Sequence, residues 1–388
     1  MPAEIKGQWF VDVSIGGISL DFEAVTSLIV VEESGNMCPT FELTASIRGL
    51  DILKNKLHAD SDVVIRLGPS SQTSFQYAFE IVDLPDIPAL RAKNEHLVKL
   101  SGIRKGYRKY YYDTWIKSYA DTVSTEVIDE ICSWVFGKSA TLSHASKDSM
   151  TWINPAMSFR EFVDHLWIHG YKDATSLFVP AIDLSNFIIY TDVIWRLNAG
   201  RSNAILTYAH GGTKDSRTFE YTSPMLNEST GFLGAYAGAG RSVGEWDLTG
   251  QTHTKQQITA GTATAQRVPT ISPYQRRFPL RHLDKDNVHE NFNVAYLQNQ
   301  TNLARFSQVG GNVMLPNQIT VGDTKRSISL LDKVTFLLEN PESEGGKSNQ
   351  SDTFFSGDYI VTKISRAYGD SSYYERIYFC RDGFGQVA

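Results

Sequence analysis

One pentapeptide in the chain has the spacing of a hydrolase nucleophile. Gly240-Arg241-Ser242-Val243-Gly244 matches G-x-S-x-G, and Asp247 and His253 follow closely. The motif works only as a strained turn between a buried strand and a helix, which exposes the serine hydroxyl. Here Gly-Ala-Tyr-Ala-Gly-Ala precedes it and no helical stripe follows. We therefore expect no catalysis at Ser242. A serine hydrolase acting on the cell envelope is kept as an alternative function.

Two histidines have a spacing compatible with metal binding. His165 and His169 are four residues apart on a predicted helix, and Glu161 lies one turn earlier, so all three share a helix face. The pattern is not H-E-x-x-H, since no glutamate lies between the histidines. We interpret them as packed or surface histidines. The glycine-rich segments fit no nucleotide-binding pattern either, so the sequence predicts no catalytic, cofactor-binding or metal-binding residue.

A basic and aromatic cluster is the third candidate. Four cations interleave with four tyrosines: Arg104, Lys105, Arg108 and Lys109 with Tyr107, Tyr110, Tyr111 and Tyr112. Such clusters bind single-stranded nucleic acid, but tyrosine and arginine are also favoured at protein interfaces. The formal net charge of the chain is −6. That charge favours the interface interpretation.

The bulk composition indicates a globular protein of more than one domain. The chain has 388 residues, of which 41% are hydrophobic and 21% charged. Its start shows no signal peptide, no segment is apolar enough for a membrane helix, and we expect no stable membrane association. The three cysteines are widely spaced and indicate free thiols in a reducing cytoplasm: Cys38, Cys132 and Cys380.

The first hundred residues predict a small β-barrel or sandwich. Residues 11–15 and 18–22 alternate between apolar and polar types around Gly16-Gly17, which predicts a hairpin. Residues 41–47, 75–81 and 97–103 form further strand-like segments.

The next hundred residues predict an α+β part. Asp121 is expected to cap a helix whose apolar stripe is Val127, Ile128, Ile131, Trp134 and Val135, with Gly137 after its end. Ser158 and Glu161 have the spacing of a capping box at the start of a second helix that ends at Gly170. Residues 177–179 and 187–190 read as strands packed on these helices.

The remaining chain returns to β structure after an insertion. Residues 231–265 are rich in Gly, Ala, Thr and Gln and predict a long loop or a loosely structured insertion. Asn287 and Glu290 are a possible capping box for a polar helix through Phe306, whose amides are expected to contact other proteins. Residues 334–338, 359–364 and 373–380 predict strands, the last two joined by a turn at Gly369-Asp370-Ser371-Ser372.

The C-terminal hairpin carries a family resemblance. Residues 356–364, SGDYIVTKI, and 374–379, YERIYF, followed by Arg381-Asp382-Gly383, resemble the closing hairpin of baseplate hub proteins of contractile-tailed phages. The N-terminal part of type VI secretion spike proteins shares this hairpin. Residues 152–190 resemble the α+β part of the same family. The chain departs from the family near Arg366, where a histidine is common.

The resemblance implies a mainly β fold with α+β parts, in which two tail-tube-like barrels accompany an α+β subdomain and an insertion. We expect a first barrel at 1–112, an α+β subdomain at 113–200, a second barrel split between 201–222 and 304–384, and an insertion at 223–303.

In function, the resemblance implies a structural baseplate hub subunit rather than an enzyme. Three chains would form a pseudo-sixfold ring that joins the tail tube to the central spike and encloses the channel for genome ejection. The implied partners are two further copies, the spike, tail tube or tube-initiator proteins, baseplate wedge components and a tape measure protein. DNA would only pass through the lumen, where an acidic lining would prevent sticking. The expected location is the virion tail baseplate, assembled in the host cytoplasm. A carbohydrate-binding module of a tail tip is the second alternative.

Overall fold

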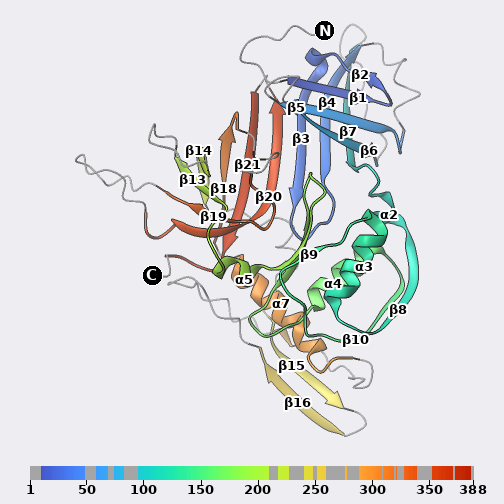
Figure 1. The fold of residues 1–388 in the computed structure, drawn as a ribbon, viewed down its shortest axis with the longest axis vertical. Helices are drawn as coiled ribbons and strands as arrows, with labels where there is room; N and C mark the ends of the chain where they lie inside the picture. Colours follow the sequence, from blue (N-terminus) through green and yellow to red (C-terminus); the bar gives the residue numbers. More distant parts are fainter. Residues whose placement is uncertain are drawn as a thin grey trace, which may run out of the picture.

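Strands dominate the structure, and most of them belong to one sheet. The computed structural model describes residues 10–48, 58–68, 74–82, 95–208, 217–226, 240–247, 251–258, 276–277, 288–307, 309–318, 320, 327–338, 352–369 and 372–385. The largest sheet has 13 strands in the order β19-β13-β14-β18-β21-β20-β3-β4-β7-β6-β5-β1-β2 and runs through two barrels (Figure 1). The predicted fold class is confirmed.

The first barrel is built from the N-terminal strands. They are β1 (Phe10–Ile15), β2 (Ile18–Ser19), β3 (Val25–Glu33), β4 (Thr40–Arg48), β5 (Asp62–Gly68), β6 (Phe75–Ile81) and β7 (Glu95–Arg104), with the 3-10 helix η1 (Phe22–Ala24) before β3. The predicted Gly16-Gly17 hairpin is confirmed, and both glycines have the positive φ that its turn requires. Alternate residues of β4 and β6 are buried, as their patterns predict.

The second barrel closes its ring of hydrogen bonds. Its strands are β13 (Ala204–Tyr208), β14 (Thr218–Leu226), β18 (Val309–Pro316), β19 (Lys333–Phe336), β20 (Gly357–Gly369) and β21 (Ser372–Arg381). Strand β19 pairs with both β13 and β20, which closes the ring. The aromatic core includes Phe379, whose ring lies 5.2 Å from Phe336 and 4.8 Å from Tyr359. The predicted C-terminal hairpin is formed by β20 and β21, although Asp370 and Ser371 of its turn lie outside the described residues.

The α+β part lies between the barrels in sequence and below the first barrel in Figure 1. It contains α2 (Arg108–Tyr112), β8 (Thr114–Thr122), α3 (Ser124–Phe136), β9 (Thr141–Leu142), β10 (Met150–Ser158), α4 (Phe159–His169), β11 (Phe178–Ile182), β12 (Ile188–Asp192) and α5 (Val193–Asn198). Strands β11 and β12 match two predicted segments and pair with each other. Strands β8 and β10 were not predicted, because apolar residues such as Trp115 and Ile116 occupy both faces of β8 and hide its alternation.

The helix ends test the capping predictions. The Ser158 capping box is confirmed: Ser158 Oγ accepts the Glu161 N–H at 3.3 Å, and Glu161 Oε2 accepts the Ser158 N–H at 2.9 Å. The Asp121 cap is wrong, since Asp121 belongs to β8 and Val123 precedes α3. The predicted α3 stripe is confirmed at Val127, Ile128 and Ile131, which are buried, and is wrong at Trp134, which is 51% exposed, because α3 buries Cys132 instead. Gly137 ends α3 in the left-handed conformation, as predicted.

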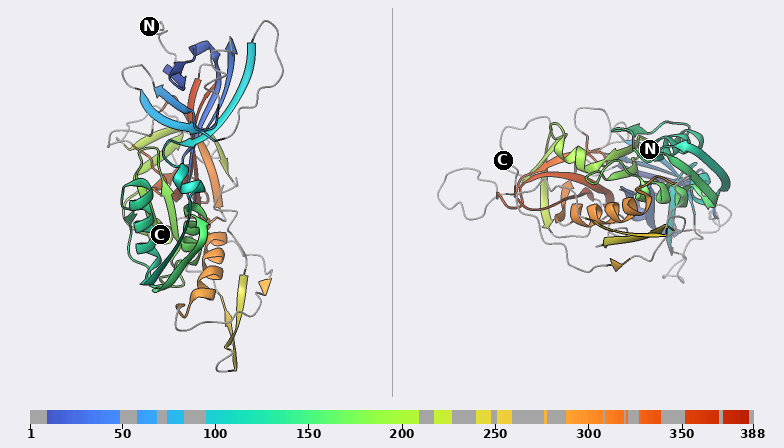
Figure 2. Two further views of the ribbon diagram at one scale, coloured as in Figure 1. Left: turned by 90° about the vertical axis from the view of Figure 1, so that its right-hand side faces the viewer. Right: turned by 90° about the horizontal axis from the view of Figure 1, so that it is seen from below.

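The insertion contains more regular structure than its composition suggests. Strands β15 (Gly240–Asp247), β16 (Thr252–Gln257) and β17 (Arg276–Arg277) form a small sheet, so the predicted loop is wrong in its described part. The ladder uses backbone groups, which need no large side chains, and Ile258 packs on Val294 and Leu297. Helix α7 (Phe292–Phe306) begins after Asn291 with no side-chain cap, so the predicted box at Glu290 is wrong, and Asn287 lies outside the described residues. Figure 2 shows the β15–β16 hairpin at the far end of the molecule from the N-terminal strands.

Among the described residues, no helix is both long and apolar enough to cross a lipid bilayer.

Candidate assembly and channel surface

The two barrels share one continuous run of strands. Strand β20 pairs with β21 of the second barrel along one edge and with β3 of the first barrel along the other. Strands β18, β21, β20, β3, β4 and β7 therefore lie side by side across both barrels, and Figure 1 shows β21, β20, β3 and β4 in this arrangement. The barrels are joined by a backbone ladder rather than by a linker.

The register separates the two faces of this shared sheet. Directly opposed residues on neighbouring strands point to the same face. One such row, Tyr368, Leu28, Leu43 and Leu100, is buried in the core of the first barrel. The adjacent row is Tyr374, Ala367, Ile29, Glu42 and Ser101, of which only Ala367 is buried. We call this second face the outer face of the shared sheet.

The outer face is rich in small and hydroxyl side chains, with few charges. Its serine and threonine residues are Ser27, Thr40, Thr44, Ser46, Ser101, Ser365 and Ser372, and Tyr374 and Tyr378 add two phenol hydroxyls. Among its residues with described side chains, the charged ones are the acidic Glu33 and Glu42 and the basic Lys99, Lys363 and Arg376. Lys363 is directly opposite Glu33 on the neighbouring strand. Such a surface has no concentrated charge of either sign.

Behind this face, a buried charged cluster joins the barrels. Arg366 of β20 donates to Glu32 of β3, and its Nε lies 3.4 Å from Oε1 of Glu375 on β21. The hydroxyls of Tyr373 and Thr320 donate to Glu375. All three charged side chains are at most 3% exposed. Breaking such a pair is costly, so this cluster fixes the relative placement of the barrels.

Sequence reasoning singled out only Arg366 of this cluster, and only as a departure from the family pattern. A signal was present: Glu32 continues the buried phase of Leu28 and Val30 along β3. Arg366 and Glu375 likewise take buried positions in β20 and β21. Charges of opposite sign at core positions of separate strands predict pairing in the interior.

The structure places Ser242 within strand β15, opposite Gln257 of β16. Asp247 ends the same strand, and His253 of β16 is opposite Trp246. A nucleophile elbow requires a turn between strand and helix. The hydrolase alternative at Ser242 is therefore wrong in its structural premise, because the matching residues lie in one hairpin.

The histidines of α4 are packed. His169 is buried, and its ring stacks on Phe292 at 4.8 Å and on Tyr296 at 4.9 Å. Burial lowers the pKa of His165, which favours its neutral form. No group of three or more His, Cys, Asp or Glu side chains suited to a metal ion occurs in the part of the chain that the structure describes. The packed interpretation is confirmed.

The basic and aromatic cluster is engaged within the chain. Lys105 Nζ lies 2.6 Å from Asp62 Oδ2, and Arg108 pairs with Asp60. The Lys109 ammonium lies 3.9 Å from the ring centroid of Trp134. Asp62 and Asp60 neutralise the positive charges of Lys105 and Arg108, which binding to nucleic acid phosphates would require.

Among the described residues, the exposed aromatic side chains give the carbohydrate-binding alternative no support. They come from separate elements: Tyr112 of α2, Trp134 of α3, Phe187 before β12, Trp195 of α5 and Tyr208 of β13. The Trp134 ring also packs on Trp115 at 4.8 Å. A sugar-binding site would gather such rings on one accessible surface.

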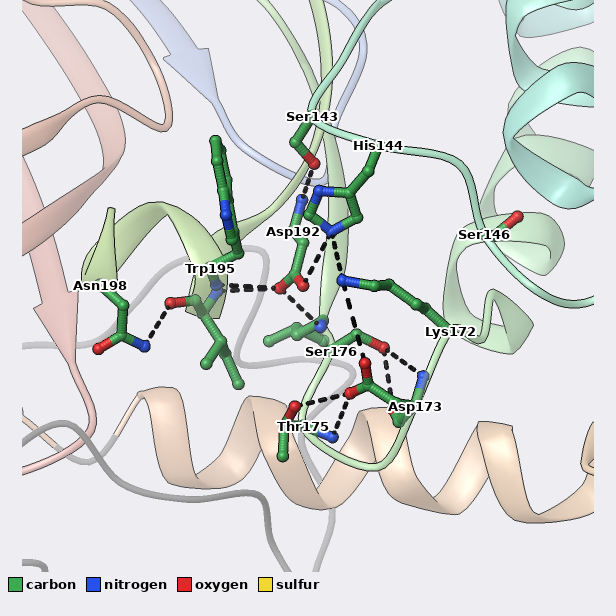
Figure 3. Close-up of polar contacts among 12 residues, drawn as sticks. Ser143, His144, Ser146, Lys172, Asp173, Thr175, Ser176, Asp192, Trp195 and Asn198 are labelled. Carbon is green, nitrogen blue, oxygen red and sulfur yellow. Dashed lines mark hydrogen bonds and ion pairs between the residues drawn. The ribbon is translucent and has the colours of Figure 1, made fainter. Parts of the chain in front are cut away.

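A polar cluster in the α+β part combines serine, histidine and aspartate, and the sequence did not indicate it (Figure 3). Asp192 Oδ2 lies 3.4 Å from Nε2 of His144, which is 3.0 Å from the Lys172 ammonium. Ser143 Oγ accepts the Asp192 N–H, so this hydroxyl serves the backbone. Asp192 Oδ1 accepts the N–H groups of Leu177, Ile194 and Trp195. The cluster therefore caps the N-terminus of α5 and connects it to the segments that carry Ser143 and Leu177.

The amides of α7 also bind within the chain. Asn299 donates to the carbonyls of Ile168 and Gly170 at 2.9 and 2.7 Å. Asn302 donates to the carbonyls of Ala174 and Ser176. The expectation that these amides contact other proteins is wrong for both residues, because they satisfy carbonyls around the C-terminal end of α4.

Comparisons with known proteins find similarity in structure only. No protein-family model matches the chain. No curated protein matches its sequence. The structure is similar to the crystal structure of the tail protein from Neisseria meningitidis MC58, with a TM-score of 0.55 and 10% identity over 97% of this chain and 98% of that one.

It is also similar to the 43 kDa tail protein of prophage MuSo2 from Shewanella oneidensis. That match has a TM-score of 0.56 and 9% identity, over 97% of this chain and 99% of the other. The chain has the fold of phage tail proteins. The expected resemblance is confirmed for the fold.

Proposed function

We propose that the chain is a structural hub subunit of a phage tail baseplate. Three copies would form a pseudo-sixfold ring that joins the tail tube to the central spike. The observation that supports this most is the single sheet through two barrels, because three chains with two barrels each present six similar units to a sixfold tube. The full-length similarity in fold to two tail proteins adds support.

The outer face of the shared sheet is our candidate for the channel lining. It extends across both barrels without interruption, so three copies would place a continuous β surface around one axis. Hydroxyl groups and dispersed charges would offer passing DNA no strong binding site. The acidic lining anticipated from the net charge finds no support among the described side chains of this face, where three basic ones accompany two acidic ones.

The proposal extends to the domains, partners and location. We propose barrels at 1–112 and at 201–222 with 304–384, an α+β subdomain at 113–200 and an insertion at 223–303. The proposed partners are the spike, tube or tube-initiator, wedge and tape measure proteins of a virion tail assembled in the host cytoplasm. We propose no enzymatic activity, and no catalytic, cofactor or metal site.

The test is the mass of the assembly. Mass photometry of the purified chain, alone and with its spike protein, should give three copies per particle. Only monomers or dimers under both conditions would contradict the proposal. Negative-stain images of the trimer should show six similar lobes around a central hole, and three lobes would argue against the role of the paired barrels.

A further inference from the structure

The turn between β11 and β12 inserts into the first barrel. Asp183 Oδ1 accepts the Phe187 N–H at 2.8 Å, and Asn186 adopts a positive φ of 66°, so the chain reverses tightly. The reversal projects Leu184, which is only 1% exposed and packs in the core of the first barrel. A residue of the α+β part thus completes the core of another part of the molecule.

Charged groups hold both backbone groups of Leu184. Its N–H donates to Glu32 Oε2, and its carbonyl accepts from Arg104 of β7. Glu32 also binds Arg366, which continues the polar chain to Glu375 in the second barrel. One buried chain of contacts therefore connects the α+β part to both barrels through this turn.

The charges around the turn do not balance. The buried acidic groups are Asp183, Glu32 of β3 and Glu375 of β21, and the basic groups beside them are Arg104 of β7 and Arg366 of β20. Lys138 lies on the exposed side of the turn, where its ammonium is 3.4 Å from the Asn186 carbonyl. With the three acidic groups and the two arginines ionised, three negative charges face two positive ones. The other titratable groups near the turn include the hydroxyls of Tyr77 on β6, Tyr373 on β21 and Tyr107, which donates to Asn186 Oδ1 in the turn, and burial raises the pKa values of all three. They stay neutral near pH 7, so one negative charge is in excess in the interior.

We propose that the Asp183–Phe187 turn is a proton-sensitive latch, which holds the α+β part against the first barrel more tightly when Asp183 is protonated. Asp183 differs from the other two carboxyl groups in its contacts. Glu32 and Glu375 each contact the Arg366 guanidinium, whereas the Asp183 carboxylate is held by the backbone N–H groups of Phe187 and Ser185. This inference does not depend on the proposed function.

The electrostatics of Asp183 support the latch. Burial, and then the negative charge of Glu32, raise the pKa of Asp183 from 3.8 to about 6. A raised folded-state pKa means that the closed turn is weakened while Asp183 is ionised, above about pH 6. The weakening disappears as the pH falls from about 6 toward 3.8, because the closed turn binds the proton first. The open turn, with Asp183 in water, binds it only near its ordinary value.

Hydrogen exchange of the whole chain measures the opening. The amides of Leu184 and Phe187 report it, since both donate within the latch. After correction for intrinsic exchange, their protection should increase about tenfold between pH 7.5 and pH 5. The reason is that pH 5 lies about one unit below the pKa of Asp183 in the closed turn, and each such unit corresponds to a factor of ten. Asp183→Asn keeps an acceptor without the charge. That variant should show the high protection at both pH values.

A second turn provides the matched control. Asp173 Oδ1 accepts the Thr175 N–H at 2.8 Å, but hydrogen bonds and Lys172 keep the pKa of Asp173 below its ordinary value despite partial burial. Protection of Thr175 should not change between pH 7.5 and pH 5. The latch is refuted if Leu184 and Phe187 protection is constant in the natural protein, if the change persists in Asp183→Asn, or if Thr175 changes equally.

Discussion

The two barrels complete their sheets by different means. The second barrel closes on itself, since β19 pairs on both sides and aromatic rings from its own strands fill the core. In the described part of the first barrel, the order of strands ends at β1 and β2, and its core takes Leu184 from the α+β part together with Tyr368 and Tyr373 from β20 and β21. The first barrel therefore takes part of its core from other parts of the chain. The second barrel closes its own ring of strands, although its core is continuous with that of the α+β part.

The charged cluster that joins the barrels should give the largest effect. Arg366→Met removes the guanidinium that contacts both Glu32 and Glu375 and leaves these two buried carboxylates without a cation between them. We expect a loss of about 3–5 kcal/mol in the free energy of unfolding, measured by urea denaturation at pH 7.5. Adding Glu32→Gln and Glu375→Gln should recover part of the loss. No recovery would show that the cluster acts by packing rather than charge.

Removing Leu184 tests the dependence of the first barrel directly. Leu184→Ala should cost about 2–5 kcal/mol, as expected for a buried leucine. Hydrogen exchange should accelerate in β3, β4 and the β11–β12 turn, and little in β18 and β19. Leu206→Ala, a buried leucine of the second barrel, is the matched control and should give the opposite distribution. Equal acceleration everywhere would mean that the barrels unfold as one unit.

The insertion of the second barrel should respond less. Asn299→Ala leaves the carbonyls of Ile168 and Gly170 without their donor, at a cost of about 1–3 kcal/mol in thermal or urea unfolding. Gln300→Ala on the same helix, where the side chain is only half-buried, should stay within about 0.5 kcal/mol. If Asn299→Ala is equally neutral in the isolated chain, the docking of α7 on α4 is not a source of stability.

The sequence predicts elements better than it predicts their associations. Alternation along β4 and β6 and the Ser158 capping box are local signals, decided within ten residues, and the structure confirms them. The contacts of Leu184 and Arg366 join residues more than a hundred positions apart, which no local pattern encodes. Composition alone gives a wrong prediction for the insertion. A glycine-rich strand can still form a backbone ladder, and asparagine can be buried when its amide donates to backbone carbonyls.

The smallest effect should come from the cap of α4. This helix belongs to neither barrel, so its loss of stability is the reference against which the effects in the barrels are compared. Ser158→Ala removes the acceptor of the Glu161 N–H and should cost about 1 kcal/mol. Hydrogen bonds from Ser158 lower the pKa of Glu161, so this contribution is present above the ordinary value of 4.5 and is lost as the pH falls through the lowered value. The variant should therefore lose less stability than the natural protein on acidification below pH 4.5.

Ser133→Ala, at an exposed position of α3, should change stability by less than about 0.5 kcal/mol at every pH. If Ser158→Ala destabilises the chain as much as Leu184→Ala does, α4 and the first barrel are energetically coupled. The comparison of the two barrels would then have to include α4.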